Sequence, residues 1–133
     1  MKTKGFTLVE LLVVIAILAI LATVSVVGYT TFIDRANQST AMQELTQIRD
    51  ALIAEDINND SFSIKTGNGG AVTLKTGTTD TEINAFITSL GLTNGTVDTI
   101  TTGATKITYK MTEKGVYAEW DLVNNVINTG KIQ

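Results

Sequence analysis

The first third of the chain combines two helical patterns that differ in how apolar residues are distributed. The segment Leu11–Ile33 contains no charged residue and is apolar at most positions. At about 1.5 Å per residue, a helix of this length covers roughly 35 Å, which is enough to cross a hydrocarbon core of about 30 Å. Farther along, Ala41, Leu45, Ile48 and Leu52 recur at i, i+4, i+7 and i+11, the spacing of a helix with one buried face.

We therefore expect one helix over residues 7–56, with a membrane-spanning half (residues 6–33) and an amphipathic half (residues 34–57). The remaining positions of the amphipathic half are charged or carry amides. We expect these side chains to face solvent or a neighbouring subunit: Asp34, Arg35, Gln38, Gln43, Glu44, Gln47, Arg49 and Asp50.

Residues 58–133 predict a small globular head that packs on the second half of the helix, because so short a unit gains much of its burial from a neighbour. Two weakly alternating segments, residues 62–65 and 71–75, flank several glycines and predict either a loop or a short hairpin. The sequence Thr79-Asp80-Thr81-Glu82 has the spacing of a helix capping box, and helical periodicity follows until Gly91. A short amphipathic helix is expected there.

The end of the chain alternates apolar and polar residues and predicts an antiparallel meander. Alternation covers residues 107–111 and 116–120, with a turn at Glu113-Lys114-Gly115 between them, and a last strand begins at Val126 after a tight turn at Asn124-Asn125. Trp120 and Tyr117 could form a ligand platform, but Trp120 shares a strand face with Val116, which favours a core position. The fold class is thus α+β, a long helix packed on a small antiparallel β-meander.

The acid Glu10 lies at the entrance to the apolar stretch. A carboxylate in a membrane helix is costly, on the order of 2.5–3.5 kcal/mol at the helix centre on insertion scales, so Glu10 needs an explanation. An ordinary signal peptide explains it poorly, because a signal core is roughly 7–15 residues long and ends at a small-residue cleavage site. Lys2 and Lys4 precede Glu10, which predicts a cytoplasmic N-terminus with the head outside.

The segment Lys4–Ile17, which reads KGFTLVELLVVIAI, resembles the class III leader and helix start of type IV pilins and pseudopilins. The resemblance implies that residues 1–5 are a leader, that a prepilin peptidase cuts between Gly5 and Phe6, and that Phe6 becomes N-methylated. It also makes Glu10 the assembly acid. The new amine of Phe6, with an unperturbed pKa of roughly 7.7–8.0, would pair with Glu10 of the next copy. A head-to-tail contact of this kind repeats into a helical filament.

The chain departs from many members of that family in lacking proline, which they carry at the position of Val27. In those proteins the helix between Ala19 and Val27 can melt when subunits pack. Here Thr23, Ser25 and Gly28 weaken the helix far less than the roughly 3 kcal/mol of a proline.

The composition offers little for catalysis. The chain has no His and no Cys, which excludes histidine triads, thiol chemistry and ordinary zinc sites, and we predict neither enzyme activity nor a cofactor. Asp56, Asn58 and Asp60 share the spacing of a calcium-loop start, but Ser61 replaces the expected glycine, so a polar helix end is favoured over a metal site. The net charge of −3 argues against general nucleic-acid binding.

Three functions share the leader. The first is a major structural subunit of a type IV pilus, anchored in the cytoplasmic membrane before assembly and part of a surface filament afterwards. Its partners would be copies of itself, the prepilin peptidase and an assembly platform. The second is a pseudopilin of a type II secretion or DNA-uptake machine. The third is a minor tip pilin that acts as an adhesin or binds DNA, for which this small acidic head is less typical.

Overall fold

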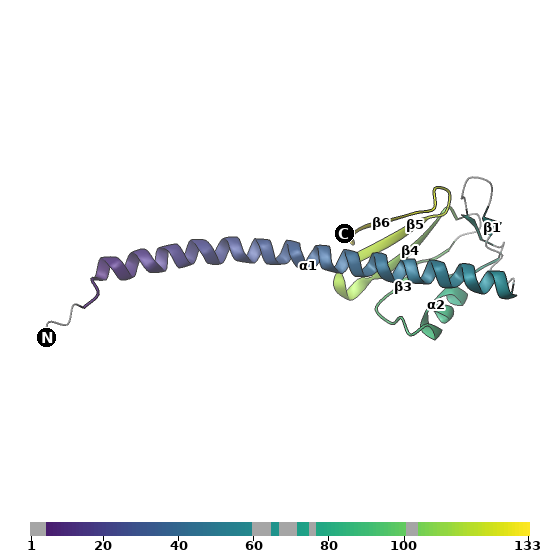
Figure 1. Ribbon diagram of the computed structural model, residues 1–133, viewed down its shortest axis with the longest axis horizontal. Helices are drawn as coiled ribbons and strands as arrows, with labels where there is room; N and C mark the ends of the chain where they lie inside the picture. Colours follow the sequence, from purple (N-terminus) through teal and green to yellow (C-terminus); the bar gives the residue numbers. More distant parts are fainter. Residues whose placement is uncertain (1–4, 60–64, 67–71, 75–76, 101–103) are drawn as a thin grey trace. The chain divides into compact units, whose positions relative to one another are not determined.

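The computed structural model describes residues 5–59, 65–66, 72–74, 77–100 and 104–133 (Figure 1). The chain forms two compact units, Met1–Arg35 and Ala36–Gln133. The first unit contains the start of the long helix α1. The second contains the remainder of α1 and the small sheet.

The helix α1 runs from Leu8 to Asn59 over 52 residues, which confirms the predicted long helix. It ends three residues beyond the expected position, because Asn58 and Asn59 continue the last turn instead of breaking it. Its sequence has no proline, and its one glycine, Gly28, costs at most about 1 kcal/mol relative to alanine. These features allow one uninterrupted helix.

In its described residues, the head contains a second helix and two antiparallel sheets. The four-stranded sheet has the order β3-β4-β5-β6, so its strands follow one another as a meander, and the two-stranded sheet pairs β1 with β2. The bounds of the elements are β1 Lys65–Thr66, β2 Val72–Thr73, α2 Asp80–Ser89, β3 Thr96–Val97, β4 Lys106–Met111, the 3-10 helix η1 Thr112–Lys114, β5 Val116–Asp121 and β6 Val126–Lys131.

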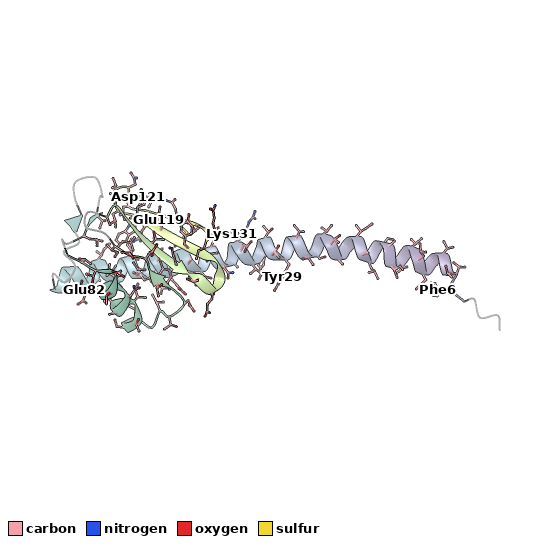
Figure 2. All side chains as sticks on the ribbon, turned by 180° about the vertical axis from the view of Figure 1, so that it is seen from behind. Phe6, Tyr29, Glu82, Glu119, Asp121 and Lys131 are labelled. Atoms are coloured by element: carbon pink, nitrogen blue, oxygen red, sulfur yellow. The ribbon has the colours of Figure 1, made fainter. Side chains whose placement is uncertain are left out.

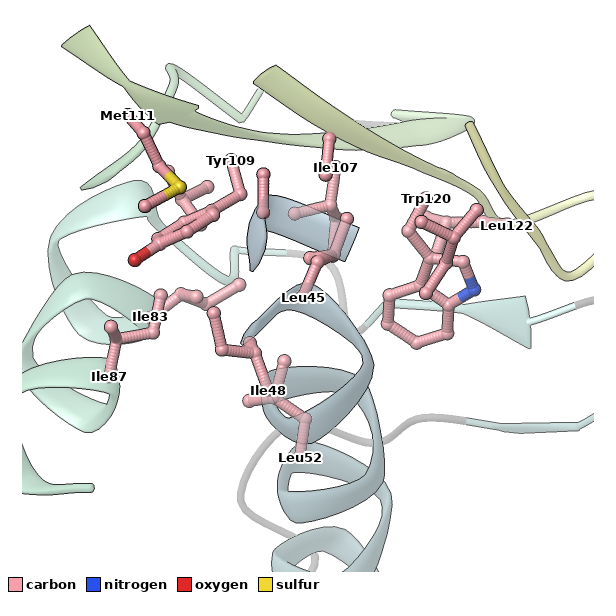
Figure 3. Close-up of a cluster of buried hydrophobic side chains, with 14 of the residues drawn as sticks. Leu45, Ile48, Leu52, Ile83, Ile87, Ile107, Tyr109, Met111, Trp120 and Leu122 are labelled. Atoms are coloured by element: carbon pink, nitrogen blue, oxygen red, sulfur yellow. The ribbon is translucent and has the colours of Figure 1, made fainter. Parts of the chain in front are cut away.

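The core lies between α1, α2 and one face of the four-stranded sheet (Figure 3). The predicted stripe of α1 is fully buried, with Leu45 and Ile48 at 0% exposure. Successive residues of β4 and β5 alternate between buried and partly exposed, so one face of each strand supplies the core. The buried set comprises Ala41, Leu45, Ile48, Leu52, Val72, Ile83, Ile87, Val97, Ile107, Tyr109, Met111, Val116, Ala118, Trp120, Leu122 and Ile127. The fold is therefore α+β and pilin-like, as predicted.

Local sequence signals account for the boundaries of several elements. Thr79 caps α2 in the expected capping box, and Gly91 follows its end with a φ of +78°, a conformation that favours glycine. Gly115, with φ +65°, closes the turn between β4 and β5. Of the two alternatives for the glycine-rich segment, a loop or a hairpin, the antiparallel pairing of β1 with β2 favours the hairpin. Residues 62–64, 67–71 and 75 of that segment lie outside the described residues.

Three expectations need correction. The two-residue strand β3 is absent from the predicted elements, because no alternation can be read from two residues. In the turn between β5 and β6, Asn125 adopts a positive φ of 54° but Asn124 does not. Glu44, expected on the solvated face of α1, is only 7% exposed, because Tyr109 and Asn94 cover it with hydrogen-bond donors.

Candidate assembly site at the start of the long helix

The first turn of α1 is closed by a reciprocal pair of hydrogen bonds between Thr7 and Glu10. The backbone N–H of Glu10 donates to Thr7 Oγ1 at 3.2 Å, and the backbone N–H of Thr7 donates to Glu10 Oε2 at 2.8 Å. The Thr7 carbonyl accepts the first helical bond, from the N–H of Leu11 at 3.2 Å. Thr7 is thus the N-cap of α1, and Glu10 completes a capping box.

A third hydrogen bond joins the two residues, because the Thr7 hydroxyl also donates to Glu10 Oε2, at 3.0 Å. The other oxygen of Glu10, Oε1, makes no hydrogen bond within the part of the chain that the structure describes. The cap therefore uses one oxygen of the carboxylate and leaves the other without a hydrogen bond among the described residues. In addition, the N-terminal end of a helix dipole favours an anion at this position.

The same box opens α2, where Thr79 and Glu82 make the corresponding bonds at 3.0, 3.2 and 3.3 Å. The sequence analysis identified the box at Thr79 but missed the one at Thr7. Both segments have the spacing Thr-x-x-Glu, so the same signal would have found the second one. The helices that the two boxes open differ in character, because α1 continues into the apolar segment and α2 into an amphipathic one.

The predicted processing residues, Gly5 and Phe6, come directly before this box. Phe6 is 90% exposed, and no atom lies within 4 Å of the position that a Cβ on Gly5 would occupy. Gly5, Phe6 and Glu10 thus lie within one short segment, with open space at the Cβ position of Gly5. Their roles in cleavage, methylation and assembly stay predictions.

The apolar half of α1 is uncovered on all sides (Figure 2). Leu8, Ile20 and Phe32 are 79%, 65% and 67% exposed, and none of the most hydrophobic 18-residue window, whose mean hydropathy is 3.0, is buried. Soluble monomers rarely expose apolar patches of more than a few hundred Å². This surface therefore requires lipid or other apolar helices around it.

Several serine and threonine hydroxyls within the apolar half donate to carbonyls of the helix itself. Thr23 Oγ1 donates to the carbonyl of Ile20 at 2.7 Å, and Ser25 Oγ donates to that of Leu21 at 2.7 Å. Thr30 and Thr31 both donate to the carbonyl of Val27. Because these polar groups are satisfied within the helix, they can enter an apolar environment without an unpaired donor.

The head holds one buried charged side chain among the described residues, and it links three elements. Glu44 of α1 accepts a hydrogen bond from the Tyr109 hydroxyl of β4 at 2.8 Å and one from Asn94 Nδ2 at 2.6 Å. Burial, followed by the hydrogen bond to Glu44, raises the pKa of Tyr109, so this side chain stays a neutral donor. Gly95 lies directly over the Tyr109 ring, 2.7 Å from Cζ to the position of a Cβ. This cluster fixes the segment between α2 and β3 on α1.

The weak metal candidate of the sequence analysis lies only partly within the described residues. Asp56 and Asn58 lie within α1, and Asp60 falls outside the described residues. Within the described ranges no group of three or more acidic, His or Cys residues could hold a metal ion. Trp120, the alternative ligand platform, is fully buried and donates its indole N–H to Asn125 Oδ1 at 3.0 Å, which makes it a core residue.

These features define a pilin-like fold, and the one long apolar helix found among the described residues fits a membrane-anchored precursor. Residues 1–26 match the family model of the prokaryotic N-terminal methylation motif. The chain thus carries the class III prepilin leader that is found in type IV pilins and pseudopilins. That leader implies processing by a prepilin peptidase and assembly into pilus-like filaments, and it points to a structural protein. No curated protein and no solved structure matches the chain.

Proposed function

We propose that the chain is a structural subunit of a type IV pilus, assembled through the apolar half of α1 after its leader is removed. The observation that carries the proposal is the start of α1. An uncovered apolar helix begins there, and Glu10 lies in its first turn, four residues after Phe6. One carboxylate oxygen of Glu10 accepts from Thr7, and the other has no hydrogen bond among the described residues.

Leader removal creates the missing charge. Hydrolysis of the Gly5–Phe6 peptide bond leaves a carboxylate on Gly5 and an amine on Phe6, and methylation of that amine keeps it cationic at neutral pH. A free amine and a free carboxylate are each costly in an apolar bundle, and each lowers the cost of the other when they are paired.

We expect the Phe6 amine of one subunit to pair with Glu10 of another subunit. Glu10 Oε2 accepts from its own Thr7, whereas Oε1 has no hydrogen bond among the described residues and can accept from the Phe6 amine of a neighbouring subunit. Such a pairing is head to tail, with the amine and the acid of each subunit engaged by different neighbours. It therefore repeats along an axis without closing, as a filament requires.

The first test concerns abundance. Fibres sheared from cells that express the chain should contain the polypeptide 6–133 as their dominant protein by mass spectrometry, with an N-methylated Phe6. A chain present only in trace amounts would exclude the major-subunit role. It would instead support the pseudopilin of a secretion or DNA-uptake machine, or a minor tip subunit.

The second test concerns the pairing. In Glu10→Ala, cleavage and membrane insertion should proceed normally while the yield of filaments collapses. Glu82→Ala is the matched control, because it removes the same capping carboxylate from α2 without touching the proposed contact between subunits. Wild-type filament yield from Glu10→Ala, or equal losses from both variants, would refute the pairing.

A further inference from the structure

We infer that, before assembly, Tyr29 and Phe32 anchor α1 in the headgroup layer on the outer side of the membrane, while Glu10 lies at the opposite surface of the hydrocarbon. The inference rests on the membrane-anchored precursor of the proposed function. It adds a defined register of the helix in the bilayer and names the residues that set it.

Helix length gives the first argument. Because α1 is continuous from Leu8, the 19 residues from Glu10 to Tyr29 cover about 29 Å along its axis. A typical hydrocarbon core is about 30 Å thick. One polar boundary residue therefore reaches each surface of the hydrocarbon when the helix stands close to the membrane normal.

The residues between these boundaries suit the lipid interior. Residues 11–28 carry no charge, and the hydroxyls of Thr23 and Ser25 donate to carbonyls of their own helix, both at 2.7 Å. No polar side chain in this stretch is left to seek water. The first charged residues after Glu10 are Asp34 and Arg35, which lie beyond the aromatic pair.

The aromatic pair gives the second argument. Tyr29 and Phe32 are 66% and 67% exposed and, at a spacing of three residues, lie on the same side of the helix. Tyrosine combines an apolar ring with a hydroxyl and is enriched where a membrane meets water. Figure 2 shows Tyr29 standing out from the ribbon, far along α1 from Phe6. Arg35, also exposed, lies six residues beyond Tyr29, about 9 Å farther along the helix axis.

This register also lowers the free-energy cost of placing the Glu10 carboxylate in the membrane. At the hydrocarbon surface its carboxylate remains within reach of water, with Thr7 as its local donor. The full cost of an acid in lipid then arises only when the subunit moves outward during assembly. The Phe6 amine of a neighbouring copy is needed at that stage.

Spin labels can measure the register, since the chain has no native cysteine. The full chain is reconstituted into vesicles of phosphatidylethanolamine and phosphatidylglycerol, with one nitroxide attached at Ile20→Cys, Thr31→Cys or Ser39→Cys. The measured quantity is the ratio of the nitroxide's collision rate with oxygen to its collision rate with a water-soluble nickel chelate. This ratio should be highest at residue 20. It should fall to the headgroup value at residue 31 and to the aqueous value at residue 39. A hydrocarbon value at residue 31 would overturn the inference.

The role of the aromatic pair is tested in the Thr31→Cys background. Tyr29→Leu with Phe32→Leu should let the label sink by about one helical turn, roughly 5 Å, whereas Tyr29→Trp with Phe32→Trp should leave its depth unchanged. An unchanged depth in the leucine pair would overturn the anchoring, and a simultaneous loss of filaments would assign these residues to contacts between copies. Vesicle depth does not depend on assembly, so failed filaments with an intact register would count against the proposed function alone.

Discussion

The Tyr109 hydroxyl donates a 2.8 Å hydrogen bond to Glu44 Oε2, although the two residues are 65 positions apart in the sequence. This bond connects β4 to α1 inside the core, where Tyr109 is 0% exposed and Glu44 is 7% exposed. Asn94 occupies the other carboxylate oxygen. The amphipathic half of α1 is therefore held in the head by a polar contact as well as by its apolar stripe.

Replacing Tyr109 with Phe should destabilise the head by about 1–3 kcal/mol, because one oxygen of a buried carboxylate loses its donor. Trp120, the single tryptophan and fully buried, reports unfolding in urea by its fluorescence in detergent-solubilised protein. The control is Tyr117→Phe on the half-buried outer face, for which we expect a change below about 0.5 kcal/mol. Equal midpoints for wild type and Tyr109→Phe would show that the Glu44 contact adds no stability.

Gly95→Ala should destabilise the head more than an ordinary loop substitution. A Cβ at this position would lie 2.5 Å from the Lys110 carbonyl oxygen and 2.7 Å from Tyr109 Cζ, and neither the strand backbone nor the buried ring can move freely. We expect a loss of about 1–3 kcal/mol in the same urea titration. Gly28→Ala provides the contrast, because nothing lies within 4 Å of its Cβ position and alanine favours a helix. A midpoint for Gly95→Ala at or above that of wild type would contradict this packing.

Acid should destabilise the turn between β5 and β6 through Asp121. Its carboxylate accepts from Asn124 Nδ2 at 2.8 Å and from the backbone N–H groups of Val123 and Asn124, and these bonds, the Asn124 side chain first, lower its pKa. A lowered folded-state pKa gives stability that is complete above the unfolded value of about 3.9 and is lost as the pH falls through the folded value.

The drop in the melting temperature of the head between pH 7 and pH 3 should therefore be smaller in Asp121→Asn than in wild type. Glu113→Gln, an exposed carboxyl on η1, should retain the wild-type drop. If Asp121→Asn and wild type lost the same number of degrees, the Asn124 contacts would not contribute to acid sensitivity.

Gly5→Val should abolish leader cleavage and leave the folded chain intact. Open space surrounds the Cβ position of Gly5, so we expect a valine there to leave the fold unchanged and to act where the peptidase binds. N-terminal sequencing of membrane fractions should find only the precursor. Gly28→Val, also in open space, should still be cut. A mature chain that begins at Phe6 in Gly5→Val would refute the assigned cleavage site.

The sequence predicted the elements whose pattern extends over several turns or strand positions. The stripe Ala41–Leu52 predicts one buried face on α1, and the alternation in β4 and β5 predicts one buried face on the sheet. Both of these faces are buried in the structure. The strand β3 was missed, since its position depends on a tertiary contact in which Asn84 bonds both the N–H and the carbonyl of Val97.

The burial of Glu44 could not be predicted for a similar reason. On α1 alone it belongs to the polar positions, and only the distant Tyr109 and Asn94 make a buried carboxylate acceptable there. At the candidate assembly site, by contrast, the local spacing Thr-x-x-Glu contained the information. The proposed role of Glu10 between copies involves a second chain, so no contact within a single chain could reveal it.

The division of the chain at Ala36 has a practical consequence for protein production. A shortened polypeptide that starts at Ala36 would keep every residue of α1 that enters the core, from Ala41 to Leu52, and would omit the uncovered apolar stretch. Such a polypeptide contains no cysteine, so it could be made in the bacterial cytoplasm without oxidative refolding and crystallised without detergent.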